Sequence, residues 1–280
     1  MRLCTLVVLG AALALNAQDQ PVGKGVNFYS TEKEAALGAQ LAADFRRVHS
    51  QLDLDNAAAP KYVEQMGARL VQASPQPSPF MYHFELTADS SGTFLEPAAV
   101  PGGYVFVPAG LILAAKDEAE LAGTLAHAIA HVAARHGTRQ ATKGQIAQLG
   151  TIPLIFWVGM VGYGGSQGAS VLLPVGFRQF QKAMESEADV LAVGIASAAG
   201  YDPEGLARYV GRVQQDPAQP AASQAAYPLR DERVKAIEQA IQALPTKNYA
   251  SSGDFARIQE EVRPALPPAP RPLKPPTLQR

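Results

Sequence analysis

Two histidines on one predicted helix have the spacing of a metal-binding pair. His127 and His131 lie four positions apart in residues 125–131, a segment whose composition favours an α-helix. Positions i and i+4 are about 40° apart around a helix axis and one turn apart along it, so both imidazoles can reach one tetrahedral ion. The same spacing also occurs on half-buried helix faces that bind nothing.

A second predicted helix could supply the remaining protein ligand. Glu185 and Asp189 also lie at i and i+4, so they share a helix face. Two histidines and one carboxylate, with a fourth position open for water, form the ligand set of a hydrolytic zinc site. Asp189 fits the second carboxylate that orients a ligand histidine. The expected cofactor is one Zn²⁺ per chain.

Five stretches of the chain, in this order, resemble the zinc metallopeptidase family of HtpX, the CAAX prenyl endopeptidases and the periplasmic chaperone-proteases. They are residues 101–107, 117–122, 127–137, 185–189 and 200–203. The resemblance runs from about residue 31 to residue 244. It implies a zincin-like fold, hydrolysis of peptide bonds, and His127, His131 and Glu185 as the zinc ligands.

The resemblance also implies where a substrate would bind. Gly103, Tyr104, Val105 and Phe106 belong to a strand that is expected to form the edge on which an extended peptide pairs. Binding through main-chain hydrogen bonds requires little sequence specificity. The expected partners are therefore peptides or unfolded protein segments.

The chain departs from the family pattern directly after His127. The family motif is His-Glu-x-x-His, and its glutamate is the general base that deprotonates the zinc-bound water and passes the proton to the leaving amine. Ala128 stands at that position. Loss of a positioned acid or base typically costs about 10²–10⁴ in rate. Glu120 is no obvious replacement, because it lies about 10 Å away along the same helix.

A second departure lies downstream, where the family commonly has His-Pro followed by Glu-Arg. Tyr227 replaces that histidine; its hydroxyl can still donate a hydrogen bond to an oxyanion, or the ring can simply pack before the next proline. Arg233 is expected to orient the site, or else to form an ion pair on its own helix. His136 lies about 140° around the helix from His131, so we expect it off the ligand face, at the surface or behind the ligands.

The elements that position these residues predict an α+β, mainly helical fold with a small sheet and an active-site helix pair. The resemblance implies that this fold is a zincin-like metallopeptidase domain. Helices are expected over residues 31–49, from about 60, and over 117–148, 177–199, 203–214 and 231–244, and strands over 80–86 and 104–107.

The first 17 residues have the pattern of a secretory signal peptide: a basic start, an apolar run and small residues at a cleavage point. Cleavage there removes the single cysteine, Cys4; an uncleaved anchor is the alternative. The expected location is periplasmic or secreted. After a flexible segment over 18–30, the metallopeptidase-like domain is expected over 31–250, and a proline-rich tail over 262–280.

Residues 144–177 contain no charged side chain and are predicted to form an apolar flap. Within them, residues 152–163 are a candidate for contact with a membrane surface. A membrane-spanning hairpin is disfavoured, because the apolar stretch is shorter than a bilayer requires and is broken by Pro153 and several glycines.

Composition and net charge exclude some classes of function. The chain has 280 residues, of which 47% are hydrophobic, and a net charge of −1, so it can bury a core but has no basic surplus for nucleic acid. The favoured hypothesis is a zinc-binding pseudoprotease that holds peptide clients. The alternatives are an active metalloendopeptidase, including one altered at Ala128 to trap substrate, and a binding module with an empty metal site.

Overall fold

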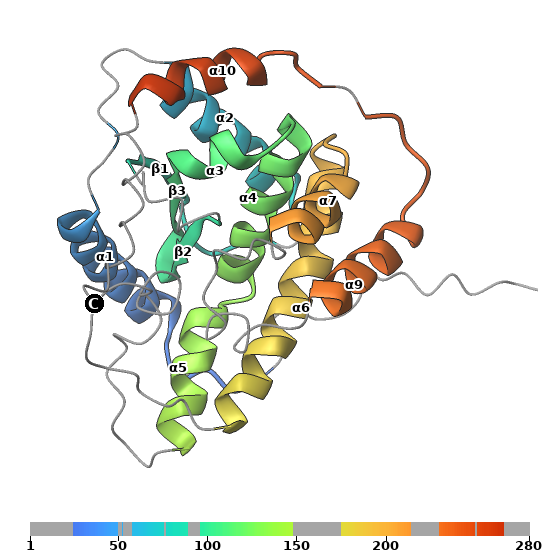
Figure 1. The fold of residues 1–280 in the computed structure, drawn as a ribbon. Helices are drawn as coiled ribbons and strands as arrows, with labels where there is room; N and C mark the ends of the chain where they lie inside the picture. Colours follow the sequence, from blue (N-terminus) through green and yellow to red (C-terminus); the bar gives the residue numbers. More distant parts are fainter. Residues whose placement is uncertain are drawn as a thin grey trace, which may run out of the picture.

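The computed structural model describes residues 25–49, 52, 58–75, 77–88, 96–147, 175–213, 230–249 and 251–265. The predicted signal peptide, Tyr227, residues 148–174 of the uncharged stretch and residues 266–280 of the tail lie outside the described residues. The helices and 3₁₀ turns are α1 (Thr31–Val48), α2 (Ala58–Ala73), η2 (Pro101–Gly103), α3 (Ala109–Ala114), α4 (Glu118–Ala133), α5 (His136–Ala147), α6 (Val175–Ala198), α7 (Glu204–Val213), α9 (Arg230–Gln242), α10 (Phe255–Val262) and η4 (Arg263–Ala265). The strands are β1 (His83–Thr87), β2 (Ala98–Val100) and β3 (Tyr104–Pro108), so the predicted mainly helical α+β class is confirmed (Figure 1).

The three strands form one sheet in the order β1-β3-β2. β1 pairs with β3 in parallel, with His83 opposite Tyr104, and β2 pairs with β3 antiparallel, with Ala99 opposite Val105. β3 is therefore the central strand. The prediction that Tyr104 to Val107 forms the edge of the sheet is wrong, because both sides of this strand already pair with neighbours.

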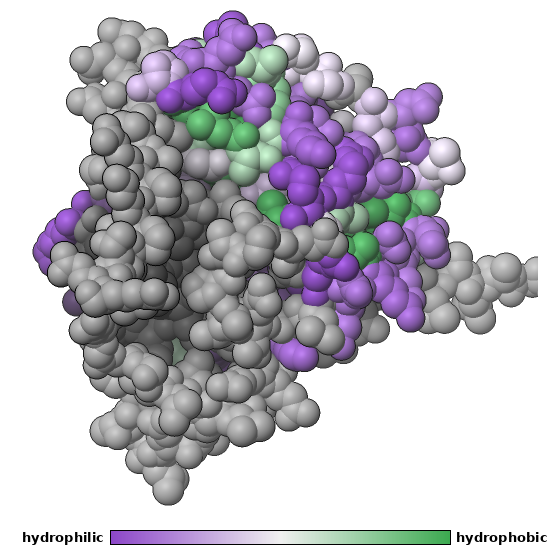
Figure 2. Space-filling view, in the orientation of Figure 1, coloured by the Kyte–Doolittle hydropathy of each residue, from purple (hydrophilic) through white to green (hydrophobic). Residues whose placement is uncertain are grey.

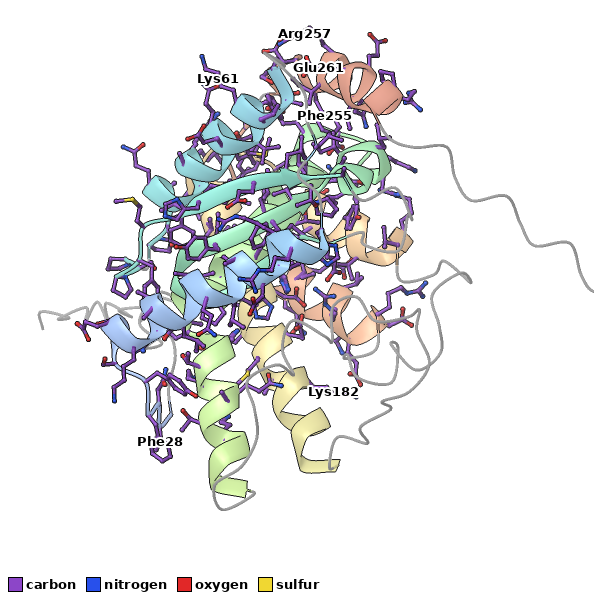
Figure 3. All side chains as sticks on the ribbon, turned by 90° about the vertical axis from the view of Figure 1, so that its left-hand side faces the viewer. Phe28, Lys61, Lys182, Phe255, Arg257 and Glu261 are labelled. Atoms are coloured by element: carbon purple, nitrogen blue, oxygen red, sulfur yellow. The ribbon has the colours of Figure 1, made fainter. Side chains whose placement is uncertain are left out.

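Alternate side chains of β3 face different helices, as the two-residue period of a strand requires. Phe106 stacks on Phe45 of α1 with ring centroids 4.1 Å apart. Val105 and Val107 belong instead to the larger core that includes residues of α2 and α4. Helix α1 consequently covers one face of the sheet (Figure 3).

The turn before β3 can be formed only with glycine. Gly102 and Gly103 have φ values of 81° and 103°, which L side chains rarely adopt. A Cβ atom on Gly103 would also lie 2.1 Å from the carbonyl oxygen of Met81. This backbone contact fixes where β3 starts.

Helix α4 lies in the middle of the molecule, between α2, α6 and α7 (Figure 1). Its N-cap is Asp117, whose carboxylate accepts a hydrogen bond from the Glu120 amide at 2.9 Å. Apart from Ala119, His131 and Ala133, its residues are buried, so α4 is a core helix although it carries polar side chains such as Glu118 and His127.

The single helix expected over 117–148 is two helices, α4 and α5. The chain turns at Arg135, which has φ 53°. The Arg135 side chain holds this turn through Nε to Glu34 Oε2 at 2.7 Å and Nη2 to the carbonyl oxygen of Tyr29 at 2.6 Å. Tertiary contacts thus stabilise a left-handed residue that is not glycine.

The packed elements continue beyond residue 250, where the sequence placed the end of the domain. In α10, Val262 is fully buried and Glu261 accepts a hydrogen bond from the amide of Ala59 in α2 at 2.7 Å (Figure 3). The expected start of the proline-rich tail at 262 is therefore the end of a packed helix.

None of the described helices is long and apolar enough to cross a bilayer. On the described part of the face in Figure 2, hydrophilic side chains gather over α7, α9 and α10, with hydrophobic patches between them. The predicted contact of residues 152–163 with a membrane surface lies outside the described residues.

Candidate metal centre

Helices α4 and α6 pack side by side and bring the three predicted ligands together (Figure 1). His127, His131 and Glu185 each offer a ligand atom, and all three atoms lie within 4.8 Å of one another. The Nε2 atoms of the two histidines are 3.0 Å apart. Glu185 Oε2 lies 3.2 Å from His127 Nε2, and Glu185 Oε1 lies 3.5 Å from His131 Nε2.

These separations match the edges of a small coordination tetrahedron. Zinc binds histidine nitrogen and carboxylate oxygen at about 2.0–2.2 Å, so the edge between two ligand atoms of a tetrahedral site is about 3.3 Å. The two Nε2 atoms are 3.0 Å apart, and each lies 3.2 or 3.5 Å from a different oxygen of Glu185, so all three separations are close to this value. The two imidazoles and the carboxylate therefore form a donor set that fits a zinc ion.

The charges around the site favour a cation. Burial alone would lower the pKa of His127, but Asp189 and Glu185 outweigh it and raise that pKa to about 9. Burial would raise the pKa of Glu185, yet the two histidines hold it well below its ordinary value. The pocket thus keeps a carboxylate ionised and attracts positive charge between the three donors.

The Nδ1 atom of His127 faces away from the other two donors and lies 2.9 Å from Asp189 Oδ1. Asp189 in turn accepts two hydrogen bonds from Arg233 of α9, at 2.8 and 2.7 Å. Asp189 and Arg233 are both buried. Arg233 Nη1 has no hydrogen-bond partner among the described residues and lies 3.6 Å from Glu96 Oε1.

The Nδ1 atom of His131 lies 3.0 Å from Nδ1 of His136. His136 is 1% exposed, so it sits behind the ligand and not at the surface. Its Nε2 atom contacts Glu187 Oε2 at 3.0 Å, and Arg139 Nη1 reaches the same oxygen at 3.3 Å. Burial lowers the pKa of His136 to about 4, so it is neutral near pH 7.

Ala128 lies beside His127 on α4 and is 2% exposed. Its methyl group can neither accept nor donate a proton. Glu120, excluded above by distance, is also engaged elsewhere: it accepts a hydrogen bond from the Lys116 amide at 2.8 Å and pairs with Arg212. The first turn of α4 therefore supplies no base to the centre.

The side chains that were expected to bind substrate lie in other contacts. Gly103 is buried in the turn before β3, and Val105 is fully buried. Tyr104 stacks on His83 with ring centroids 4.9 Å apart, and Phe106 stacks on Phe45. The short strand β2 pairs only with β3 in the described part of the sheet and also contacts α4, so β2 is an edge strand that packs against the helix of the two histidines.

Several residues of this centre were not found from the sequence. Glu96 and Glu187 carry no motif, and Arg139 is one of several basic residues in its segment. For His136 a partial signal existed, since it was expected either at the surface or behind the ligands. Only the turn at Arg135 decides between these two positions.

Residues 57–241 match the model of a family described as Peptidase family M48. The chain belongs to this family. M48 peptidases depend on a metal ion, typically zinc, in accordance with the His/His/Glu donor set described above.

Similar curated proteins extend this result. The chain is 27% identical over 206 residues to a beta-barrel assembly-enhancing protease of Yersinia pestis, which covers 70% of this chain and 41% of that protein. It is 26% identical over 206 residues to a putative beta-barrel assembly-enhancing protease of Vibrio cholerae, covering 70% and 42%. The protein of that name from Escherichia coli K12 is 27% identical over 161 residues, covering 55% and 32%. The chain thus spans less than half the length of these relatives.

Proposed function

We propose that this M48 chain is an extracytoplasmic zinc-binding protein that holds peptide or unfolded protein segments and hydrolyses them poorly or not at all. His127, His131 and Glu185 would hold one zinc ion. The observation that carries the proposal is a complete donor set whose neighbouring base position is Ala128. Zinc in such a site polarises a peptide carbonyl and lowers the pKa of a bound water.

The side chains present here can bind and orient a client but cannot move its protons efficiently. A carboxylate at position 128 would take a proton from water and return it to the leaving amine, and alanine does neither. Tyr227 stays a predicted hydrogen-bond donor to an oxyanion. Arg233 would act indirectly, because its two hydrogen bonds to Asp189 hold the carboxylate behind His127.

For the client we propose an extended segment paired with the free side of β2. Two observations support β2 over β3: it is an edge strand, and it packs against α4. Glu96, two residues before β2, also lies 3.6 Å from Arg233 Nη1, which links this edge to the support of His127. An unpaired strand edge can bind an extended peptide through main-chain groups.

The predicted signal peptide supports a periplasmic or secreted location. The relatives named beta-barrel assembly-enhancing protease support clients among unfolded envelope proteins.

The test compares the natural chain with Ala128→Glu and Ala128→Gln. Zinc content is measured for each protein, and casein cleavage is followed in one assay. We expect about one zinc per chain in all three and cleavage by Ala128→Glu alone, faster than the others by about 10²–10⁴. Ala128→Gln matches the volume of glutamate without its base. Absence of zinc, or cleavage by the natural chain at the Ala128→Glu rate, would refute the proposal.

An active peptidase is the second candidate, and Glu96 is the observation in its favour. This carboxylate is partly exposed, lies beside Arg233 and precedes the edge strand. If the natural chain cleaves casein, Glu96→Gln should abolish the activity without loss of zinc. Unchanged cleavage by Glu96→Gln would exclude Glu96 as the substitute base.

A further inference from the structure

The break between α4 and α5 determines where His136 lies. In a continuous helix, His136 would be about 140° around the axis from His131 and could not reach it. Because Arg135 adopts φ 53°, the chain turns and α5 starts at His136. The two imidazole rings then meet nearly edge to face, with centroids 4.9 Å apart and an interplanar angle of 76°.

The contact between these rings constrains the hydrogen on each nitrogen. The two Nδ1 atoms are 3.0 Å apart, so one must carry a hydrogen and the other a lone pair. A histidine that binds zinc through Nε2 keeps its hydrogen on Nδ1. His131 would therefore donate from Nδ1, and His136 would accept at Nδ1.

The other nitrogen of His136 completes the pattern. With its Nδ1 as acceptor, a neutral His136 carries its hydrogen on Nε2, and that atom lies 3.0 Å from Glu187 Oε2. A carboxylate is the acceptor that this hydrogen requires. The His131 Nδ1–H thus donates to His136 Nδ1, and the His136 Nε2–H donates to Glu187.

The end of this chain of hydrogen bonds is also held in place. Arg139 Nη1 lies 3.3 Å from Glu187 Oε2 and 3.2 Å from the carbonyl oxygen of Ala134. Glu187 is two residues beyond the proposed ligand Glu185 on α6. Helix α6 therefore carries both the proposed ligand Glu185 and the outer carboxylate Glu187, whereas His136 and Arg139 come from α5.

We infer that His136 is a positioning residue for the metal ligand His131, which it holds in the Nδ1–H tautomer through its own bond to Glu187. The inference rests on the proposed zinc site. It makes the two ligand histidines unequal: a buried carboxylate, Asp189, supports His127, whereas a neutral imidazole supports His131. Partners of this kind typically change metal affinity by about 10–100-fold.

The test titrates the full chain with Co²⁺, whose visible absorption reports tetrahedral binding, and compares His136→Leu with His136→Asn. Leucine fills the space but cannot accept a hydrogen bond. Asparagine offers Oδ1 near the place of Nδ1. We expect His136→Leu to weaken Co²⁺ binding by about 10–100-fold and to shift the absorption bands, and His136→Asn to keep most of the affinity.

A matched control separates positioning from general destabilisation. Thr142 lies on α5, is fully buried, and its hydroxyl accepts a hydrogen bond from the Phe28 amide at 3.0 Å. Thr142→Val should lower the thermal midpoint without altering the Co²⁺ spectrum. Equal losses of Co²⁺ affinity in His136→Leu and Thr142→Val would overturn the inference, and so would an equal loss in His136→Asn and His136→Leu.

The Co²⁺ absorption of the natural chain separates a failure of the zinc site from a failure of the inference about His136. A natural chain without Co²⁺ absorption would overturn the zinc site and this inference together. Normal absorption that His136→Leu leaves unchanged would overturn the inference alone. Long-range ¹H–¹⁵N NMR of the zinc-loaded chain gives a direct readout, since we expect the Nε2–H tautomer at His136; the Nδ1–H tautomer there would overturn the inference.

Discussion

Arg233 donates one hydrogen bond to each carboxylate oxygen of Asp189, at 2.8 and 2.7 Å, and both side chains are buried. The pair connects α9 to α6, and Asp189 Oδ1 also lies 2.9 Å from the Nδ1 atom of His127. One ion pair therefore joins the packing of a distant helix to the orientation of a proposed metal ligand.

Replacing Asp189 should affect both stability and metal binding. Asp189→Asn removes the buried counter-charge of Arg233 and leaves only the partly exposed Glu96, 3.6 Å from Nη1, so we expect the free energy of unfolding to fall by about 3 kcal/mol. Zinc affinity should fall by about 10–100-fold, because His127 loses its orienting carboxylate. Urea unfolding and zinc titration measure the two effects.

The double variant Asp189→Leu/Arg233→Met separates these effects. It removes both charges, so much of the lost stability should return. Zinc affinity should stay low, because neither replacement accepts a hydrogen bond from His127. Recovery of both quantities together would show that Asp189 acts on the metal only through stability.

Two helical glycines should respond to alanine with opposite signs. At Gly123 in α4, a Cβ atom would lie 2.8 Å from the Leu206 amide nitrogen of α7, so Gly123→Ala forces the helices apart. We expect a loss of about 1–3 kcal/mol. At Gly194 in α6, a Cβ atom meets nothing within 4 Å, and Gly194→Ala should gain about 0.5–1 kcal/mol from helix propensity. The denaturant midpoints of both variants measure these changes in stability. A higher midpoint for Gly123→Ala would contradict the close packing of α4 against α7.

Glu118 should make stability depend on acid pH. Its carboxylate accepts hydrogen bonds from the Tyr62 hydroxyl at 2.8 Å, from the Ser252 amide and hydroxyl at 2.8 Å, and from the Ser251 hydroxyl at 3.1 Å. Burial raises the pKa of Glu118, but these bonds outweigh it and lower that pKa below the ordinary value. The ionised form is therefore favoured by folding, and its contribution is present above the unfolded pKa of about 4.3 and lost as pH falls through the folded pKa.

Glu118→Gln should consequently cost about 1–3 kcal/mol at pH 7, and the difference from the natural chain should shrink below pH 4. Urea unfolding of both proteins at pH 7 and below pH 4 measures this difference in the free energy of unfolding. Glu238→Gln replaces an exposed glutamate of α9 and should follow the natural chain throughout. A cost at Glu118 that stays constant with pH would rule out the ionised carboxylate as its source.

The sequence predicted the features that depend on local patterns. The helix expected over residues 31–49 is α1, and the i, i+4 pairs predicted that His127, His131 and Glu185 could meet; the structure brings them together. It could not predict the turn at Arg135, because its stabilising partners, Glu34 and Tyr29, are about a hundred residues away in the chain. For the same reason the sequence left two positions open for His136, at the surface or behind the ligands, and the structure shows the second.

The edge strand was missed because its signal is short. β2 has three residues, Ala98 to Val100, and alanine is a poor strand former, so the sequence did not predict this strand. The resemblance placed the edge on β3 instead. For α10 a signal was available: Phe255, Ile258 and Val262 follow a helical period, and all three are buried. The prolines that follow predicted an extended tail from residue 262, and this helix was not predicted.

The supports of the two ligand histidines extend in different directions, through Arg233 into α9 and through His136 into α5. Local unfolding of either helix would remove one orienting group while the ligands themselves stay on α4 and α6. Release of the ion would then follow the rate of helix opening and not the strength of its bonds alone. Amide hydrogen exchange should therefore slow in α5 and α9 when zinc is added, although neither helix carries a ligand.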